Sequence, residues 1–185
     1  AGPSLGDHLE SLKQKKGILI GAGTALNLLN DAGIQTDLGV AFDSKETGAR
    51  RLQSCNAVFI PFLVDLDSSN GVQYLSGPKF LTKQGKLAPW KEKLLHKLGV
   101  EEELLEIGPS ISSTHYAIES AIKLGASEIM LLGVDLAYVK GRQYAGDKTW
   151  LLDEEDPTPI QERTDLIFFD ALPVSRLFFK ETEIF

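Results

Sequence analysis

The stretch GPSISSTHYAIESAIKLGASEIMLLGVD, residues 108–135, carries the clearest structural pattern in this 185-residue chain. A Gly-Pro pair breaks the chain, and apolar residues then recur at helical spacing over 112–124, where a glycine ends the helix. The next run, 128–134, is apolar and stops at Asp135, which predicts a buried strand. A helix followed directly by a fully apolar strand is typical of α/β proteins.

The same alternation recurs elsewhere in the chain. Apolar runs predict strands, and amphipathic segments closed by glycine predict helices: strands at 17–21, 37–42 and 57–64, and helices at 24–32 and 90–98. Pro61 predicts that its strand lies toward an edge of the sheet or ends early. Residues 65–90 hold many turn formers and predict an irregular connection with a short strand at 72–75. We expect an α/β fold that is Rossmann-like, a mostly parallel sheet with helices on both faces.

Composition excludes several classes of protein. The length and the 43% hydrophobic content indicate a single globular domain over 1–185. The net charge of −7 comes mostly from 151–185, where nine acidic and three basic residues give −6, so duplex nucleic acid is not an expected partner. One cysteine, Cys55, excludes an intrachain disulfide and a cysteine-based zinc site. The sequence shows no 18-residue apolar run and no signal peptide, so we expect a cytoplasmic protein with no membrane span.

Polar residues gather where the predicted strands end. In open α/β sheets, ligands bind beyond the carboxyl ends of the strands and beside helix N-termini. The candidates at such positions are Gly21, Gly23, Thr24, Asp43, Ser112, Ser113, Thr114 and the loop from Asp135 to Tyr144. The glycines allow close backbone approach to a phosphate, although glycine is equally common in such turns for steric reasons alone.

The chemistry of these side chains leaves two kinds of role open. The hydroxyls of 112–114 offer contacts to a phosphate or ribose, with one of them expected to serve only as a helix cap. The carboxylates of Asp43 and Asp135 suit ribose hydroxyls or a divalent metal, or equally a loop held through backbone N–H groups. We favour a ligand-facing role for Asp43 and a structural role for Asp135.

His115 and two tyrosines complete the candidate set. His115 lies in the first turn of the hydroxyl-rich helix and is the best placed of three histidines for acid–base work. From spacing alone, Tyr138 and Tyr144 favour ordinary half-buried loop residues over a phosphate contact. The residues by themselves therefore predict an α/β domain with a phosphate- or nucleotide-binding edge.

Three segments together resemble a known family. They are Gly2-Pro3-Ser4-Leu5, the stretch from Gly23 to Asp43, and the stretch from Ser110 to Tyr138. This set resembles the motility-associated factor (MAF) glycosyltransferase-like domain, also called the 6-hydroxymethylpterin diphosphokinase MptE-like domain. The resemblance implies a nucleotide-binding region over 1–147, with Gly2, Pro3, Ser4 and Asp135 among its binding residues, and an acidic extension over 148–185. It also implies that a strand and further protein precede the Gly-Pro-Ser-Leu motif.

The last of these segments is also similar to bacterial sialyltransferases that use CMP-activated sugars. That similarity reverses the spacing-only interpretation of Tyr138 and Tyr144, because it implies that both contact the leaving CMP phosphate. It further implies that 112–114 contact the nucleotide and that Asp43 lies near the ribose or base. Those enzymes place a catalytic histidine after the second tyrosine, whereas no histidine follows His115 here.

Three functions follow as hypotheses. The leading one is a glycosyltransferase-like domain that binds a CMP-activated nonulosonic acid and transfers the sugar to a protein or glycan hydroxyl, with Tyr138, Tyr144 and His115 as catalytic candidates and no cofactor or metal. The first alternative is an ATP-dependent hydroxymethylpterin diphosphokinase, which would need Mg²⁺ with Asp43 as a ligand. The second alternative is a catalytically degenerate interaction domain.

Overall fold

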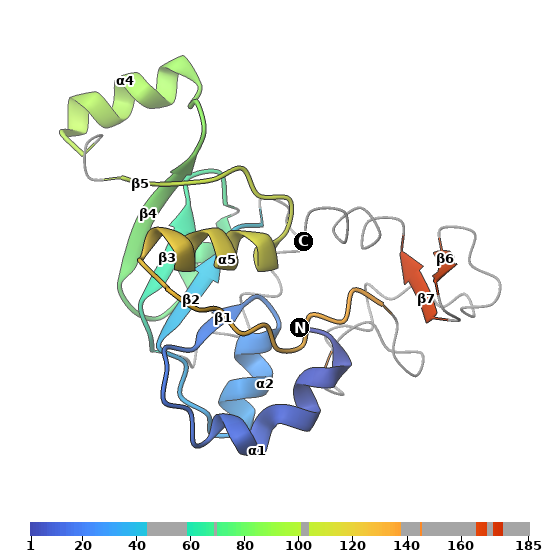
Figure 1. Cartoon of the computed structure of the whole chain (residues 1–185). Helices are drawn as coiled ribbons and strands as arrows, with labels where there is room; N and C mark the ends of the chain where they lie inside the picture. The colour runs from blue at the N-terminus through green and yellow to red at the C-terminus, as the bar shows by residue number, and fades with distance from the viewer. Residues whose placement is uncertain are drawn as a thin grey trace.

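The core of the structure is a parallel sheet whose strands follow one another in chain order (Figure 1). The computed structural model describes residues 1–43, 59–68, 70–100, 104–137 and 145, and the backbone of 166–169 and 172–175. Every neighbouring pair in the sheet is parallel. The strands, in spatial order, are β1 (Ile20–Ala22), β2 (Leu38–Ala41), β3 (Phe62–Asp65), β4 (Lys79–Gln84) and β5 (Leu105–Ile107).

Helices cover both faces of this sheet, as the sequence predicts. In Figure 1, α5 (Ser113–Lys123) crosses the front of the sheet and α2 (Ala25–Asp31) lies behind and below it. The remaining helical elements are η1 (Pro3–His8), α1 (Leu9–Leu12), η2 (Asn70–Tyr74) and α4 (Pro89–Leu98). The predicted helices at 24–32, 90–98 and 112–124 are therefore confirmed to within a residue or two.

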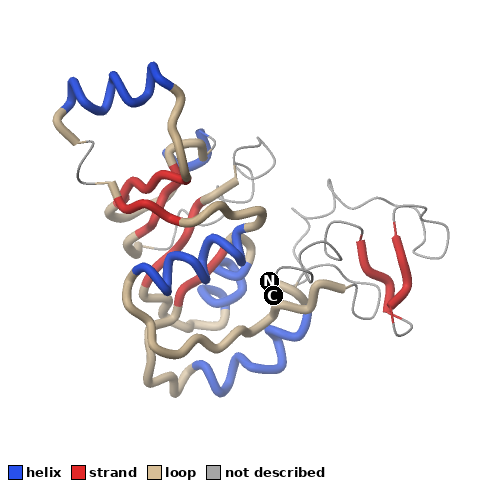
Figure 2. Tube along the Cα trace, turned by 45° about the horizontal axis from the view of Figure 1, so that its top comes forward, coloured by secondary structure: helices blue, strands red, loops and turns tan. Residues whose placement is uncertain are grey.

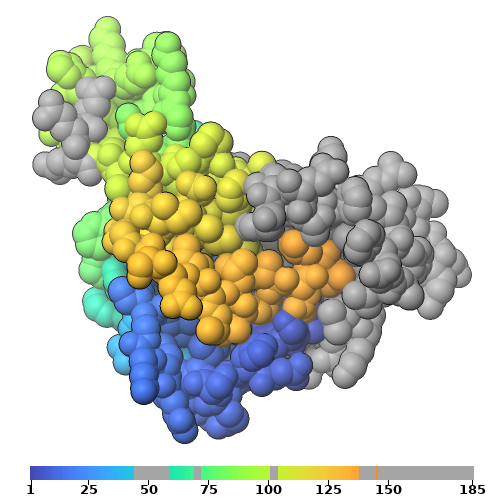
Figure 3. All heavy atoms as spheres, viewed as in Figure 1, coloured from blue at the N-terminus to red at the C-terminus, as the bar shows by residue number. Residues whose placement is uncertain are grey.

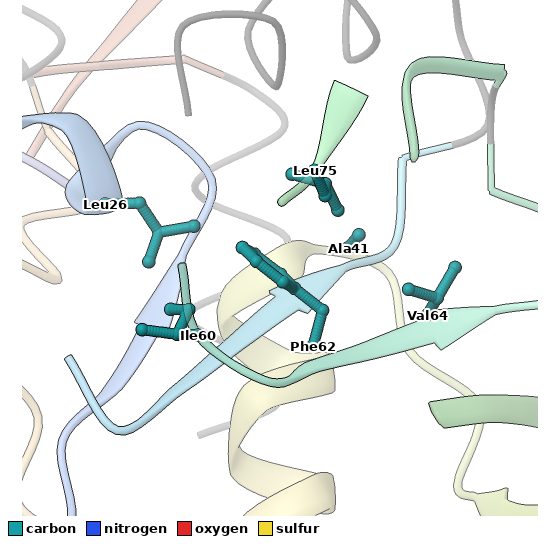
Figure 4. Packing of buried hydrophobic residues seen from close by; sticks show 6 residues of the cluster. All are labelled: Leu26, Ala41, Ile60, Phe62, Val64 and Leu75. Carbon is teal, nitrogen blue, oxygen red and sulfur yellow. The ribbon is translucent and has the colours of Figure 1, made fainter. Parts of the chain in front are cut away.

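Alternating strand residues supply two separate cores, one on each face. On the first face, Leu26 of α2 packs on a cluster centred on Phe62, which is fully buried (Figure 4). On the second face, Tyr116 of α5 packs on Val40, Leu63 and Ile107. Because consecutive strand residues point to opposite faces, β3 serves both cores at once. The first cluster consists of Leu26, Ala41, Ile60, Phe62, Val64 and Leu75.

Two expectations about the middle of the sheet are wrong. Pro61 does not move its strand to an edge: β3 pairs with β2 and β4, and the proline lies just before the first strand residue. Its missing N–H is not needed there, while its carbonyl accepts the Gly39 N–H at 2.9 Å. The connection 65–90 also differs: residues 70–74 form η2 in place of the short strand expected at 72–75, and Lys79–Gln84 form β4. The sequence pattern misses β4 because Lys79 and Lys83 lie on the same strand as its apolar residues.

The predicted buried strand at 128–134 is not present. The structure assigns no strand to these residues, and Ile129, Met130 and Leu131 are 38%, 79% and 46% exposed. Figure 3 shows this segment (orange) on the surface beside the N-terminal residues (dark blue). An apolar run indicates that a segment is suited to burial, but a strand forms only where a neighbouring backbone offers hydrogen-bond partners.

The acidic C-terminal part contributes a hairpin. β6 (Leu166–Phe169) pairs with β7 (Leu172–Ser175) in an antiparallel sheet of its own. β6 follows the apolar run at 166–169, a pattern that favours a strand, and a second apolar run at 177–179 lies outside the described residues. In both Figure 1 and Figure 2 the hairpin lies apart from the parallel sheet.

Helix α4 gives a matched test of which contacts stabilise the domain. It stands away from the sheet in both views (Figure 2), and Leu94 is 49% exposed whereas Leu95 is 6% exposed. We expect Leu95→Ala to lower the free energy of unfolding by about 2–3 kcal/mol. Leu94→Ala changes helix propensity equally but should cost no more than about 0.5 kcal/mol. Urea unfolding of both variants measures the difference. Equal losses of stability would contradict the claim that Leu95 is buried and Leu94 exposed.

The start of β2 carries a pH-dependent contact. Asp37 accepts the Leu19 N–H at 2.7 Å and pairs with Lys15. Partial burial raises the pKa of Asp37, but the Leu19 hydrogen bond and the charge of Lys15 more than offset that effect, so its pKa is lowered. A lowered pKa in the folded state stabilises the protein above the pKa of the unfolded chain, and this stabilisation is lost as the pH falls through the folded value.

Asp37→Asn should therefore destabilise the protein by about 1 kcal/mol at pH 7, a fall of about 2–4 °C in melting temperature. The gap from wild type should narrow as the pH falls below about 4, where the carboxyl of the unfolded chain takes up a proton, and should close below the lowered pKa of the folded state. Thermal melts between pH 3 and pH 7 measure it. Glu10→Gln is the control, because the Glu10–Lys13 pair is solvent-exposed; a gap as large at pH 3 as at pH 7 would rule out the carboxylate as its cause.

Candidate functional site

Parallel pairing brings the carboxyl ends of all five strands to one edge of the sheet. The predicted site residues lie in loops at or beside this edge. They form two groups, one after β1 and one around the start of α5. The first is called the Asp135 group below, and comprises Gly2, Pro3, Ser4, Gly23, Thr24 and Asp135. The second is called the α5-start group, and comprises Asp43, Ser112, Ser113, Thr114 and His115.

Asp135 holds the loop that opens the chain. Its carboxylate accepts the Ser4 N–H at 2.9 Å and the Ser4 hydroxyl. Nearby, the Gly2 N–H donates to the Gly133 carbonyl at 2.6 Å. A Cβ on Gly2 would lie 2.5 Å from Asp135 Oδ2, so the loop approaches this closely only because residue 2 is glycine. Asp135 therefore caps the start of η1, which begins at Pro3, and both carboxylate oxygens are engaged in doing so.

The turn after β1 adjoins the same loop. Gly23 has φ +52°, a left-handed conformation that favours glycine and that directs the chain into α2. Thr24 occupies the N-cap position but makes no side-chain cap bond. Its hydroxyl instead accepts a hydrogen bond from the amino group of Ala1 at 2.9 Å, and the residue is buried. The structure thus brings Thr24 to the opening loop rather than to its own helix.

Tyr138 and Tyr144 lie outside the described residues. The residues on either side of their segment are described and belong with the Asp135 group. Ala137 is buried, two residues after Asp135, and the Ala145 N–H donates to the Ala1 carbonyl at 3.0 Å. The Ala145 end of the tyrosine-bearing segment therefore adjoins Ala1, whose nitrogen binds Thr24.

The start of α5 offers backbone donors and hydroxyls. Ser112 is the cap that one of the three hydroxyls was expected to be: its Oγ accepts the His115 N–H at 3.2 Å. The N–H groups of Ser113 and Thr114, in the first turn, have no acceptor within the helix. Together with the helix dipole they form an environment that favours an anion, and the two hydroxyls are half-buried beside them.

Two other members of the α5-start group are placed by packing. His115 has its Nε2 3.8 Å from Glu119 Oε1, one turn further along the helix, and its Nδ1 is buried. Asp43 follows Phe42, whose ring stacks on Tyr116 with centroids 5.3 Å apart. The stack holds the end of β2 against the first turn of α5, and Asp43 is the next residue in the chain.

Tyr116 anchors α5 to the sheet. It is fully buried, and its phenol is hydrogen-bonded to the Thr82 hydroxyl on β4. Burial raises the pKa of Tyr116 to about 12, although the Thr82 hydrogen bond acts in the opposite direction. The phenol is therefore neutral at physiological pH and acts as a structural contact.

The sequence analysis did not identify a series of linked hydrogen bonds at this edge. Asp65, at the end of β3, is only 4% exposed, and its Oδ2 accepts a hydrogen bond from Gln84 Nε2 at 3.0 Å. Gln84, at the end of β4, in turn accepts the Ser110 N–H at 2.7 Å. Burial raises the pKa of Asp65, while the Gln84 hydrogen bond and the charge of Lys91 act to lower it. A signal existed: Asp65 follows an apolar run just as Asp43 and Asp135 follow theirs.

Two features are absent from the part of the chain that the structure describes. Within the described ranges, no group of three or more His, Cys, Asp or Glu side chains is arranged to hold a metal ion. Each helix in the same ranges is too short or too polar to cross a bilayer.

Comparison with known proteins shows a family match and a solved structure with a similar fold. Residues 1–141 match the family described as 6-hydroxymethylpterin diphosphokinase MptE-like. The MAf glycosyltransferase from Magnetospirillum magneticum AMB-1 has a similar fold, with a TM-score of 0.62 and 18% sequence identity. That match covers 97% of this chain and 27% of the glycosyltransferase, so the chain spans about a quarter of that protein's length. No curated protein matches the sequence.

The resemblance carried by the Gly-Pro-Ser-Leu motif and the stretch that ends at Tyr138 is confirmed by the family match. The Rossmann-like α/β fold is confirmed by the parallel sheet and by the likeness to the glycosyltransferase. Because the match over 1–141 takes in well over half of its residues, the chain belongs to the 6-hydroxymethylpterin diphosphokinase MptE-like family.

Proposed function

We propose that this chain is a glycosyltransferase-like domain that binds a CMP-activated nonulosonic acid and transfers its sugar to a protein or glycan hydroxyl. The single observation that carries the proposal is the α5 start, where the first amides of the helix lie beside the half-buried hydroxyls of Ser113 and Thr114. Such neutral donors suit the single phosphate that leaves as CMP, because they stabilise its charge electrostatically.

The fold supports the same proposal. A solved glycosyltransferase has a similar fold, and the likeness extends over 97% of this chain. In the proposed complex the phosphate lies at the α5 start, and Asp43 faces the ribose or base. Tyr138 and Tyr144 donate to the leaving phosphate, which adds no charge to the site. Asp135 acts through Ser4, which it holds in place at the same edge.

A second function is favoured by the family match, which names a diphosphokinase. Transfer of pyrophosphate from ATP to a hydroxymethylpterin requires carboxylates for Mg²⁺. Asp43 stands at the end of β2, and Asp65 at the end of the neighbouring β3. Each oxygen of Asp65 accepts a hydrogen bond, from the Asp67 N–H and from Gln84, and Asp43 is the candidate ligand on this alternative.

Calorimetric titration with CMP tests the leading proposal. We expect wild type to bind, and Thr114→Val to weaken binding about five- to tenfold, because one hydrogen bond to the phosphate is lost while the shape is kept. Tyr138→Phe and Tyr144→Phe should each weaken binding to a similar extent. Ser127→Ala, beyond the far end of α5, is the control and should leave the affinity unchanged.

Two outcomes would contradict the proposal. One is an absence of CMP binding by wild type, and the other is unchanged affinity in Thr114→Val and in both tyrosine variants. Stabilisation by ATP that depends on Mg²⁺, without stabilisation by CMP, would favour the diphosphokinase.

His115 is the proposed base for the acceptor hydroxyl. His115→Gln keeps a polar side chain but cannot take up a proton at neutral pH, so we expect transfer to fall at least a hundredfold while CMP affinity changes less than about twofold. Transfer assays on the CMP-sugar and the same calorimetry measure the two quantities. Retention of transfer in His115→Gln would remove His115 from the mechanism.

A further inference from the structure

Gln84 joins two parts of the carboxyl edge through the two ends of its side-chain amide. Its Nε2 donates to Asp65 Oδ2 at 3.0 Å, and its Oε1 accepts the Ser110 N–H at 2.7 Å. Asp65 Oδ1 accepts the Asp67 N–H at 2.8 Å. The chain of hydrogen bonds therefore has a direction, from the turn before α5, through the end of β4, to the end of β3.

That direction determines what residue 65 has to be. The backbone N–H groups of Asp67 and Ser110 can only donate, so Gln84 must turn its oxygen to Ser110 and its NH₂ to residue 65. Residue 65 then meets a donor at each of its two oxygens. Only an ionised carboxylate satisfies both, because an amide or a protonated carboxyl presents a hydrogen to one of them.

The same strand holds α5 at a second point. Thr82 and Gln84 are two residues apart in β4, so they lie on the same face of the sheet, the face that α5 covers. Thr82 binds the buried phenol of Tyr116 in the first turn of α5, and Gln84 binds Ser110 two residues before the N-cap. The position of the α5 start relative to the strand ends thus depends on two side chains of β4.

We propose that Gln84 is a positioning residue for the ligand at the α5 start, and that Asp65 acts through it as a buried, ionised carboxylate. The proposal rests on the proposed function, because the ligand is the CMP phosphate at Ser113 and Thr114. Neither Asp65 nor Gln84 touches that ligand. Their effect is to hold the Ser110 turn, and with it the first amides of α5, where the phosphate meets them.

Exchange of the two functional groups gives a direct test. Asp65→Asn places an NH₂ against that of Gln84, and Gln84→Glu places a carboxylate against that of Asp65, so each single variant breaks the chain. In the double variant the new amide at position 65 donates to the new carboxylate at position 84. That carboxylate still accepts the Ser110 N–H, and all three hydrogen bonds are restored with the net charge unchanged.

We expect each single variant to bind CMP about tenfold more weakly, and the double variant to recover to within about twofold of wild type. Gln73→Glu, an exposed position in η2, is the matched control for the added charge. Leu95→Ala is the control for lost stability and should keep wild-type affinity. Additive losses in the double variant, or single variants that melt early but bind CMP normally, would overturn the positioning role.

Hydrogen exchange of the Ser110 amide tests the same single and double variants in the absence of ligand. Its exchange should be at least tenfold faster in each single variant and return to the wild-type rate in the double variant. If wild type does not bind CMP, the proposed function fails while this measurement still decides the positioning role. Unchanged exchange in both single variants would overturn the positioning role.

If a single variant does not fold, recovery of folding in the double variant supports the directed chain of hydrogen bonds. A double variant that also fails to fold overturns it.

Discussion

The buried bond between Tyr116 and Thr82 is the contact on which the rest of the edge depends. A phenol hydroxyl taken out of water costs free energy unless it finds a partner, and on this face Thr82 supplies one. The ring also packs on Val40, Leu63 and Ile107 from three different strands. The hydrogen bond and the packing of the ring therefore fix where the first turn of α5 lies over the sheet. The loops that precede α5 have to reach that position.

Polar contacts at the edge are made mostly with backbone groups. Asp135 accepts the Ser4 N–H, Asp65 accepts the Asp67 N–H, and Gln84 accepts the Ser110 N–H. Each side chain satisfies a loop N–H that no regular strand ladder satisfies. An edge built this way keeps helix amides and hydroxyls in place, where the proposed phosphate would meet them.

Local patterns in the sequence predicted much of this architecture. The helices around Leu26 and Tyr116 follow from apolar spacing and from glycine at their ends, and β2 follows from its apolar run. β4 was missed because its lysines interrupt the apolar pattern, and Pro61 was misjudged because a proline just before a strand does not disturb it. The run 128–134 was expected as a strand from hydrophobicity alone, although pairing depends on which backbone lies beside it.

The sequence by itself determined the α/β class, the family, and the candidate residues Thr24, Asp43, Ser112 and Asp135, because strand-to-loop transitions and capping hydroxyls are local signals. The tertiary structure alone decided that Asp135 holds Ser4 from 131 residues away and that Gln84 links Asp65 to Ser110. Such partners are chosen by the packing of the sheet and its helices. Hydrogen bonds between distant loops leave no periodic trace in the chain.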